Sequence, residues 1–245
     1  MRESIFKITE NAPLTQTVYK MKLQGDVSDI TSSGQFVNIK LDGLYLRRPI
    51  SVCDSEDGVL TLIYKVVGNG TEQMSKMAAG EELNILTGLG NGYDLSLSGD
   101  KPLLLGGGVG VPPLYMLCKK LIAEGKKVSV VLGFNTKEEV FCEEDFKALG
   151  ADVFVTTVDG SYGIKGFVTD AMKEIDYTYF YTCGPEPMLK AIFKVSATSG
   201  QFSFEERMGC GFGACMGCSC KTVTGYKRIC KDGPVLTKEE ILWAD

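Results

Sequence analysis

The segment that most constrains the fold is GCGFGACMGCSC (209–220), which places four cysteines within twelve residues. Residues 201–245 around it contain too little apolar sequence to build a core of their own. A module of this kind usually needs a metal to fold. The chain contains no histidine, so sulfur has to supply the ligands. Catalysis by Ser-His-Asp, Cys-His or imidazole groups is excluded, and any demanding chemistry has to come from a cofactor.

The cysteine spacing indicates an iron–sulfur cluster. Cys210, Cys215 and Cys218 form C-x4-C-x2-C, and Cys230 follows after eleven further residues. This is the plant-type spacing for a [2Fe–2S] cluster, and the glycines between the cysteines allow the backbone to approach the sulfides. Structural zinc normally uses two C-x2-C pairs, whereas only one is present here. The spacing and the absence of histidine therefore favour the cluster. Cys220 is expected not to be a ligand, because four ligands already exist.

The composition indicates which kinds of partner the protein can bind and in which compartment it is expected. A net charge of −5, with no basic run, argues against nucleic acid or an anionic membrane as a partner. The least polar stretch, residues 102–118, is broken by glycines and prolines, so no membrane span is expected. The first residues lack the apolar region of a signal peptide. With nine cysteines in the chain, this favours the reducing cytoplasm, where clustered cysteines bind metal more often than they pair.

Residues 1–96 have the pattern of an antiparallel β-barrel. Short runs of alternating apolar residues are separated by Gly, Asp and Ser, which is typical of such barrels. A short helix is expected in TEQMSKMAAG (71–80). The six expected strands are two in residues 4–25 and one each in GQFVNIKL (34–41), YLRRPISVCD (45–54), VLTLIYKVVG (59–68) and EELNILTGLG (81–90).

Residues 97–200 have a different pattern, in which strands alternate with helices. Alternation of this length predicts βαβ units and a parallel sheet with right-handed crossovers. The expected fold is therefore α/β plus all-β: a six-stranded antiparallel barrel, a parallel-sheet domain and a small C-terminal [2Fe–2S] module at 201–245. Strands are expected in 101–108, 126–134, 151–157 and 176–184, and helices in 111–125, 137–150, 164–175 and 186–200.

Two motifs in the barrel indicate a flavin. In RRPISVCD, the guanidinium of Arg48 can bind a phosphate, and the hydroxyl of Ser51 can hydrogen-bond the edge of a flavin ring. In VGNGTEQMS, Gly68 and Gly70 free the backbone, and Thr71 begins a helix whose N-terminus would face a pyrophosphate. Alone, the first could be an edge strand and the second a glycine hairpin with a capped helix. Together, on a barrel, they favour FAD.

Three loops of the α/β domain indicate a nucleotide. LLLGGGVGVPPLY follows a buried strand and opens a helix, where a phosphate binds in α/β folds. It is not the standard Rossmann fingerprint, because Val111 and Pro112 occupy the end of that pattern. DGSYGIKGFVTD and CGPEPMLKAI lie at the ends of later strands, although CGP could also be a plain strand-to-helix turn. No acidic residue lies at the usual distance to bind a ribose, and Lys137 could face a 2′-phosphate or solvent, so the residues leave NAD and NADP open.

These motifs together resemble the ferredoxin–NADP reductase superfamily, which combines a flavin barrel with R-P-x-S and a nucleotide domain with G-G-G-x-G and C-G-P-x-x-M. The tail ERMGCGFGACMGCSC…RICKDGPV is similar to that of the electron-transfer subunits of two-subunit, NAD-linked dihydroorotate dehydrogenases. The resemblance covers essentially the whole chain. It implies a cytoplasmic oxidoreductase subunit of pyrimidine (UMP) biosynthesis that passes electrons from the FMN of a catalytic partner through [2Fe–2S] and FAD to NAD⁺.

The resemblance also implies specific residues and a specific assembly. The partner would be an FMN-containing subunit that oxidises dihydroorotate, in a heterotetramer with two copies of each chain. No catalytic side chain is implied for the hydride step. The residues implied for FAD are Arg48, Pro49, Ile50, Ser51, Ile63, Tyr64, Lys65, Gly70 and Thr71. Those expected for NAD are Gly107, Gly108, Gly110, Asp159, Cys183, Gly184 and Pro185, and the cluster ligands would be Cys210, Cys215, Cys218 and Cys230.

Two other hypotheses remain at this stage. Small subunits of NADP transhydrogenases and sulfide dehydrogenases share the barrel, the nucleotide domain and a C-terminal cluster. Four cysteine ligands and a chain that stops soon after DGPV favour the dihydroorotate complex over these. A non-enzymatic redox sensor or zinc-stabilised binding module would leave the flavin and nucleotide motifs unexplained.

Overall fold

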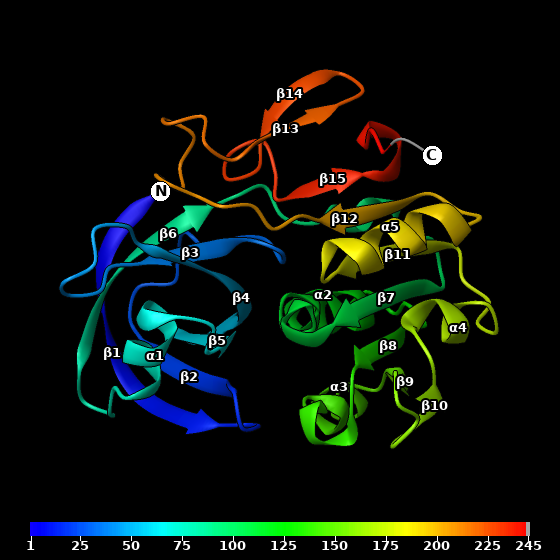
Figure 1. The fold of residues 1–245 in the computed structure, drawn as a ribbon, viewed down its shortest axis with the longest axis horizontal. Helices are drawn as coiled ribbons and strands as arrows, with labels where there is room; N and C mark the ends of the chain where they lie inside the picture. The colour runs from blue at the N-terminus through cyan, green and yellow to red at the C-terminus, as the bar shows by residue number, and fades with distance from the viewer. Residues whose placement is uncertain (244–245) are drawn as a thin grey trace.

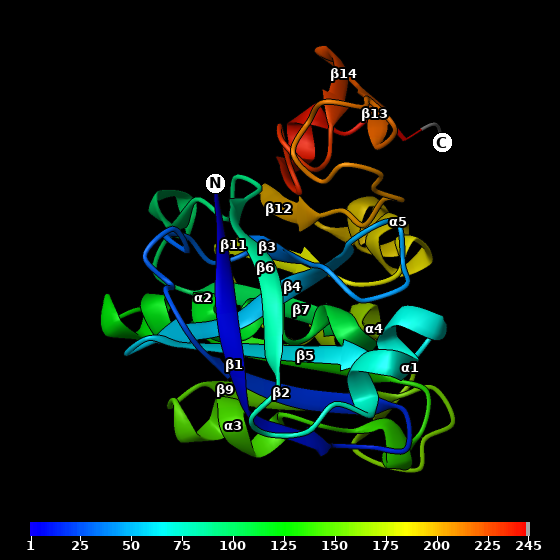
Figure 2. The same ribbon diagram turned by 90° about the vertical axis from the view of Figure 1, so that its left-hand side faces the viewer.

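The computed structural model describes residues 1–243 and contains three parts (Figure 1). A barrel forms the blue and cyan part of the molecule, a parallel sheet with its helices forms the green and yellow part, and the cysteine-rich module, in orange and red, lies across one end of both. This arrangement is also visible in the turned view of Figure 2. In the described residues, no helix has the length and apolar character needed to cross a membrane.

The N-terminal part is the predicted six-stranded antiparallel barrel. Its closed strand order is β1-β2-β5-β4-β3-β6, so no strand edge is left unpaired. Alternate residues such as Val37 and Ile39 on β3, and Leu60 and Leu62 on β5, are fully buried in its interior. The strands are β1 (Arg2–Pro13), β2 (Val18–Gln24), β3 (Phe36–Ile39), β4 (Arg48–Glu56), β5 (Val59–Lys65) and β6 (Glu82–Leu89), and helix α1 (Asn69–Ser75) follows β5.

The second part is a seven-stranded sheet in the order β10-β9-β8-β7-β11-β12-β15. All neighbours pair in parallel except β15, which is antiparallel to β12. Leu104 packs with α2 and α3 on one face, whereas Leu103 and Leu105 pack with α4 and α5 on the other, as expected for a strand buried on both sides. The strands are β7 (Pro102–Gly107), β8 (Ser129–Phe134), β9 (Asp152–Thr157), β10 (Ile164–Lys165), β11 (Tyr179–Cys183), β12 (Gly200–Ser203) and β15 (Val235–Thr237). The helices are α2 (Pro113–Ala123), α3 (Glu143–Ala148), α4 (Val168–Met172) and α5 (Glu186–Val195).

Two of the predicted helices begin several residues later than expected, and the helix predicted over 186–200 ends at Val195, because Gly200 already belongs to β12. The helix predicted over 137–150 is wrong in its first half, which contains only a 3-10 turn at 137–139. Val140 is extended and Cys142 has a left-handed backbone with φ of 62°, so α3 begins only at Glu143. The helix predicted over 164–175 starts with strand β10, because Gly166 at φ of 128° interrupts the backbone before α4.

In the sequence, the cysteine-rich module lies between β12 and β15, which are neighbouring strands of the sheet. It contains the hairpin of β13 (Ser219–Thr222) and β14 (Gly225–Arg228), preceded by the loop that carries the first cysteines. The chain leaves the sheet after β12 and returns to it as β15. The division expected after residue 200 therefore lies inside β12, and the sheet is completed by residues from the C-terminal segment.

Contacts between barrel and sheet hold the two parts together. Lys119 of α2 reaches across to Asp54 (3.1 Å) and Glu56 (2.7 Å) at the end of β4. The hydroxyl of the buried Tyr93, in the connection between the parts, donates to the carbonyl of Thr182 on β11 (3.2 Å). These contacts set the carboxyl ends of β7 and β11 beside the barrel strands that carry the predicted flavin motif.

Candidate functional site

The two predicted flavin motifs meet in space. Arg48 begins β4, and Gly70 lies in the first turn of α1. A Cβ atom at Gly70 would overlap the Nε of Arg48, so the arginine side chain lies directly on the glycine backbone. Arg48 also donates to the carbonyl of Leu46 (2.8 Å), which leaves guanidinium nitrogens for a phosphate. The structure thus brings the two predicted flavin motifs into direct contact.

Thr71 has a structural role at the start of α1. Its hydroxyl accepts from the N–H of Val67 (3.0 Å) and donates to the carbonyl of Gly68 (3.1 Å). The prediction that Thr71 begins the helix is wrong, because Gly68 is the N-cap and Thr71 is the third residue of α1. Its two bonds instead tie the preceding loop to the first turn. The side chain of Thr71 therefore holds the loop in shape, and a ligand here would meet the loop backbone.

The three residues of β5 that are expected to bind FAD, Ile63, Tyr64 and Lys65, face different surroundings. Tyr64 is buried with the barrel interior, and its hydroxyl donates to Oδ1 of Asn11 (3.0 Å). Burial raises the pKa of Tyr64 to about 12, so the phenol is neutral. Ile63 is buried in the cluster shared with the α/β domain, and Lys65 is exposed. Because the side chain of Tyr64 points into the barrel, only the backbone of Tyr64 could contact a ligand bound outside the barrel.

Pro49 and Ser51 are half-buried residues of β4, and their register with β3 shows which way they face. Pro49 pairs with Asn38 of β3, and Ser51 pairs with Phe36. Residues directly opposite each other in an antiparallel pair share one face. Phe36 packs with Leu89 and with residues of the sheet and module rather than with the barrel interior. Pro49 and Ser51 therefore face outward, toward the rest of the molecule.

The glycine loop after β7 packs directly against the CGP turn after β11. A Cβ atom at Gly110 would overlap the carbonyl of Cys183, and one at Gly107 would press on Met188 and Pro185. Gly108 differs, because it has φ of 52° and open space where its Cβ would lie. Burial raises the pKa of Cys183 to about 12, so this thiol is protonated at neutral pH. The structure thus brings two of the three predicted nucleotide loops into contact.

The third predicted loop lies further along the sheet. Asp159 follows β9, which is separated from β7 by β8. Its carboxylate accepts from the hydroxyl (2.6 Å) and the N–H (2.9 Å) of Ser161, and these bonds lower the pKa of Asp159. The Ser161 hydroxyl in turn accepts from the N–H of Lys137 (2.8 Å) in the loop after β8. Asp159 is therefore part of a separate pair of loops at the same edge of the sheet.

The four predicted ligand cysteines are arranged as two pairs, because the side chain of Cys210 contacts that of Cys215 and the side chain of Cys230 contacts that of Cys218. The Sγ of Cys210 accepts from the N–H groups of Ala214 (3.2 Å) and Cys215 (3.4 Å). The Sγ of Cys218 accepts from the N–H of Cys230 (3.4 Å). Within residues 1–243, no three Cys, Asp or Glu side chains group closely enough to hold a single metal ion. Two pairs of thiols fit a binuclear cluster, in which four thiolates serve two irons.

The two pairs differ in their electrostatic surroundings. Burial acts to raise the pKa of Cys210, but N–H groups of the loop and the neighbouring Cys215 lower it to about 6. Burial and the adjacent Cys218 raise the pKa of Cys230 to about 12. Backbone N–H groups directed at sulfur are the outer contacts that iron–sulfur sites use. The half-buried Cys220 lies on β13 opposite Lys227, beyond these pairs.

The sequence analysis missed an ion pair that closes the cysteine loop. Nη1 of Arg228 donates to the carbonyl of Gly213 (2.9 Å), and its other nitrogens contact the carboxylate of Asp232 (3.0 and 3.2 Å). This ties the first cysteine segment to the segment that carries Cys230. The spacing of four residues between Arg228 and Asp232 was a possible signal, but nothing in it indicated the distant Gly213 carbonyl.

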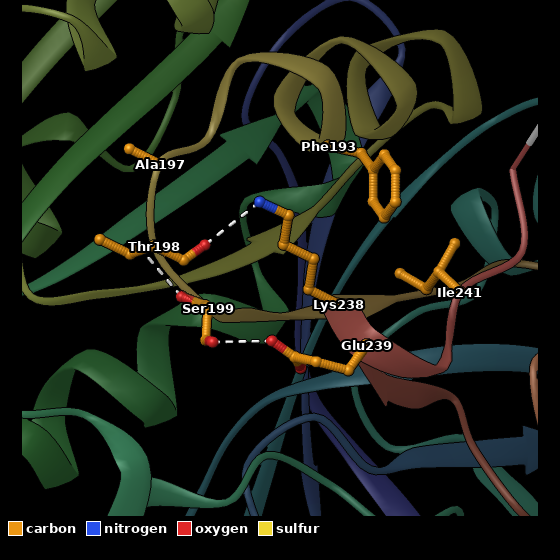
Figure 3. Close-up of a pocket in the computed structure, with 7 residues that line it drawn as sticks. All are labelled: Phe193, Ala197, Thr198, Ser199, Lys238, Glu239 and Ile241. Atoms are coloured by element: carbon orange, nitrogen blue, oxygen red, sulfur yellow. Dashed lines mark hydrogen bonds between the residues drawn. The ribbon is translucent and has the colours of Figure 1, made fainter. Parts of the chain in front are cut away.

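A shallow pocket of about 430 Å³ lies away from these residues, beside α5 (Figure 3). Nζ of Lys238 donates there to the carbonyls of Ser196 (2.7 Å) and Thr198 (3.3 Å), and Ser199 donates to Glu239 (2.7 Å). These polar groups bind each other and fasten the chain after β15 to the loop before β12. The pocket contains none of the predicted site residues. Its lining consists of Phe193, Ala197, Thr198, Ser199, Lys238, Glu239 and Ile241.

Comparison with protein families matches two parts of the chain. Residues 205–242 match the iron–sulfur cluster binding domain of dihydroorotate dehydrogenase B, and residues 104–194 match the oxidoreductase NAD-binding domain. The chain is 44% identical to the dihydroorotate dehydrogenase B (NAD(+)) electron transfer subunit of Fusobacterium nucleatum, with 96% of each chain covered. It is also 44% identical to the subunit of the same name from Bacillus pumilus, with 98% of each covered.

Solved structures give the same fold. The chain is similar to an NADH-dependent reduced ferredoxin–NADP oxidoreductase, with a TM-score of 0.88, 30% identity and coverage of 97% of this chain and 90% of that one. A ferredoxin–NADP⁺ reductase from Neisseria gonorrhoeae has a TM-score of 0.70 at 18% identity, covering 79% of this chain and 90% of that one. At that identity the second likeness concerns the fold alone.

The contact between the two loops predicts destabilising effects of different size for two glycine substitutions. Gly110→Ala should lower the free energy of unfolding by about 3 kcal/mol, because backbone atoms of Cys183 and Gly184 block its methyl group. Gly108→Ala should cost only about 1 kcal/mol, for its left-handed backbone, because the space around it is open. Urea unfolding of both variants measures the difference. Equal costs would contradict the packing described for these loops.

Proposed function

Because the chain belongs to the family of dihydroorotate dehydrogenase B electron-transfer subunits, we propose that it carries electrons from a catalytic partner subunit to NAD⁺ in pyrimidine biosynthesis. The observation that carries this proposal is the arrangement of four thiols in two pairs, with backbone N–H groups directed at the sulfur atoms. Such a site suits a [2Fe–2S] cluster, and the flavin strands lie on the adjacent barrel.

Three cofactors divide the chemistry. The cluster supplies one-electron transfer, FAD connects one-electron to two-electron transfer, and NAD⁺ takes up a hydride. The residues of this chain bind and orient these groups, and none of them is required as an acid or base. Cys210 and Cys215 would hold one iron, and Cys218 and Cys230 the other. The Arg228–Asp232 pair would keep the loop closed around them.

The geometry of the two domains supports the proposed cofactor residues. Arg48, over Gly70, would bind a phosphate of FAD, and the loop that the Thr71 hydroxyl holds in place would pass beside it. Pro49, Ile50 and Ser51 on β4, and the backbone of Ile63, Tyr64 and Lys65 on β5, would line the flavin. The joined loops at Gly107, Gly108 and Gly110 and at Cys183, Gly184 and Pro185 would hold NAD, with Asp159 further along the same sheet edge.

The partner is the finer part of the proposal. The name of the relatives, an electron transfer subunit, requires a second subunit that does the catalysis. We propose an FMN-containing subunit that oxidises dihydroorotate, in a heterotetramer with two copies of each chain, located in the cytoplasm. A second candidate is the small subunit of an NADH-dependent ferredoxin–NADP oxidoreductase, which the 30% identity over 97% of the chain favours. The higher identity to the dihydroorotate dehydrogenase subunits supports the first.

Anaerobic spectroscopy of the protein mixed with its FMN-containing partner tests the function. NADH should bleach both the flavin bands and the broad iron–sulfur absorption of the chain alone. Dihydroorotate should bleach them only when the partner is present. Bleaching by reduced ferredoxin, with none by dihydroorotate, would favour the second candidate. Protein without flavin or iron would refute both.

The cysteine assignment predicts different results for two serine variants. Cys230→Ser should lose most of its iron and acid-labile sulfide, because one of the two pairs is broken. Cys220→Ser, the matched control, should keep both, because Cys220 lies outside the pairs. Iron and sulfide per FAD, together with the EPR spectrum of the reduced protein, measure this. Loss of the cluster in Cys220→Ser would overturn the assignment.

The contact between Arg48 and Gly70 predicts the behaviour of two glycine variants. Gly70→Ala should displace the Arg48 side chain and weaken FAD binding at least about tenfold, the value of one charge-assisted hydrogen bond. Gly68→Ala is the control, because its backbone is extended and its Cβ would meet open space. Titration of the apoprotein with FAD gives both affinities. Equal losses would mean that Arg48 does not bind the cofactor.

A further inference from the structure

Asn38 is a buried polar residue that neither the flavin motif nor the cysteine motif includes. It lies in the middle of β3 with 1% of its surface exposed, between Val37 and Ile39, which point into the barrel interior. Since successive side chains of a strand point to opposite faces, Asn38 points outward, as Phe36 does. Phe36 packs in the cluster that contains Cys218 and Cys230. Asn38 therefore faces the cysteine-rich module.

The amide of Asn38 holds the backbone of a proposed cluster ligand. Its Nδ2 donates to the carbonyl of Cys210 (3.3 Å). The next residue, Gly211, has a left-handed backbone with φ of 79°, and a Cβ there would overlap the same Nδ2. The cysteine loop thus turns tightly around the Asn38 side chain, and only glycine permits the approach.

The strand partner of Asn38, Pro49, belongs to the proposed flavin site, whereas Asn38 itself is not among the proposed flavin-binding residues. Asn38 is the direct partner of Pro49 in the register of β3 and β4, two residues from the Phe36–Ser51 pair. Its carbonyl accepts from Nη1 of Arg47 (3.2 Å), which fixes the strand at this point. Asn38 therefore lies on the same outward face as Pro49 and Ser51.

The second polar atom of the side chain has no partner. Among the residues that the structure describes, nothing hydrogen-bonds the buried Oδ1 of Asn38. Buried polar atoms nearly always have a partner, so an unpaired one between two binding sites indicates a place for a bound group or water. This observation is independent of the contact with Cys210.

We propose that Asn38 is a positioning residue, which fixes the Cys210 end of the cluster loop on the flavin-binding strand pair and so sets the electron-transfer contact between the two sites. The inference rests on the proposed function. It adds a residue that is not a cluster ligand but connects the two cofactor sites. Asn38 donates a hydrogen bond to the cluster loop, and it pairs with Pro49 of the proposed flavin site in the strand register. Outer residues of this kind typically change metal affinity or activity by about 10–100-fold when replaced.

The test uses the complete protein with FAD and cluster bound. Asn38→Leu removes the amide at similar size, and Asn38→Asp replaces the donor with a carboxylate that repels the Cys210 carbonyl. Asn84→Leu is the control, because Asn84 is also a barrel asparagine with a buried, unpaired Oδ1, on the neighbouring strand β6. Anaerobic stopped-flow with NADH follows flavin and cluster reduction separately, and EPR and a redox titration report the cluster itself.

The two Asn38 variants should reduce their flavin at the wild-type rate and their cluster at least about tenfold more slowly, with an altered EPR spectrum or midpoint potential. Loss of iron with FAD retained would support the same role. Wild-type cluster reduction and EPR spectra in both variants would overturn it, as would an equal effect of Asn84→Leu or loss of FAD along with iron in both variants. If instead the wild-type protein lacks FAD or the cluster, the proposed function fails first.

Discussion

The cysteine-rich module depends on a hydrophobic cluster that it shares with the rest of the protein. Ile229, Cys218 and Cys230 are almost completely buried, together with Phe36 of the barrel and Phe202 of the sheet. A segment of this size cannot enclose a core by itself, so its shape depends on these neighbours. The consequence is functional: the same contacts that fold the module also determine where its thiols lie relative to the barrel.

The path of the chain reinforces this dependence. The module leaves the sheet after β12 and returns as β15, so both of its ends are anchored in one sheet. The side chain of Asn91, in the connection from barrel to sheet, donates to the carbonyl of Val235 (2.8 Å) and accepts from its N–H (3.1 Å). It thereby continues the hydrogen bonding of β15 into the barrel connection. The barrel, the sheet and the cysteine-rich module therefore meet where Asn91 contacts β15.

The sequence predicted the parts of the protein that rest on local pattern. Alternating apolar residues indicated all six barrel strands, and the cysteine spacing indicated the module. The helix predicted over 137–150 was wrong only in its first half, where Cys142 is buried in the core with a left-handed backbone and tertiary packing outweighs helix propensity. The bond from Tyr64 to Asn11 joins distant segments, so the sequence could not show that this side chain points into the barrel.

The glycine-rich loop shows how one pattern can have two physical causes. Its glycines indicated a phosphate site, yet Gly107 and Gly110 are required by the CGP turn that packs on them, and only Gly108 faces open space. Close packing on the CGP turn and a phosphate site are compatible, because glycines have no side chains and so let the backbones at two strand ends approach closely. A nucleotide held there would contact two loops that are locked to each other. Binding would then require little rearrangement of the loops, which keeps the cost of ordering them low.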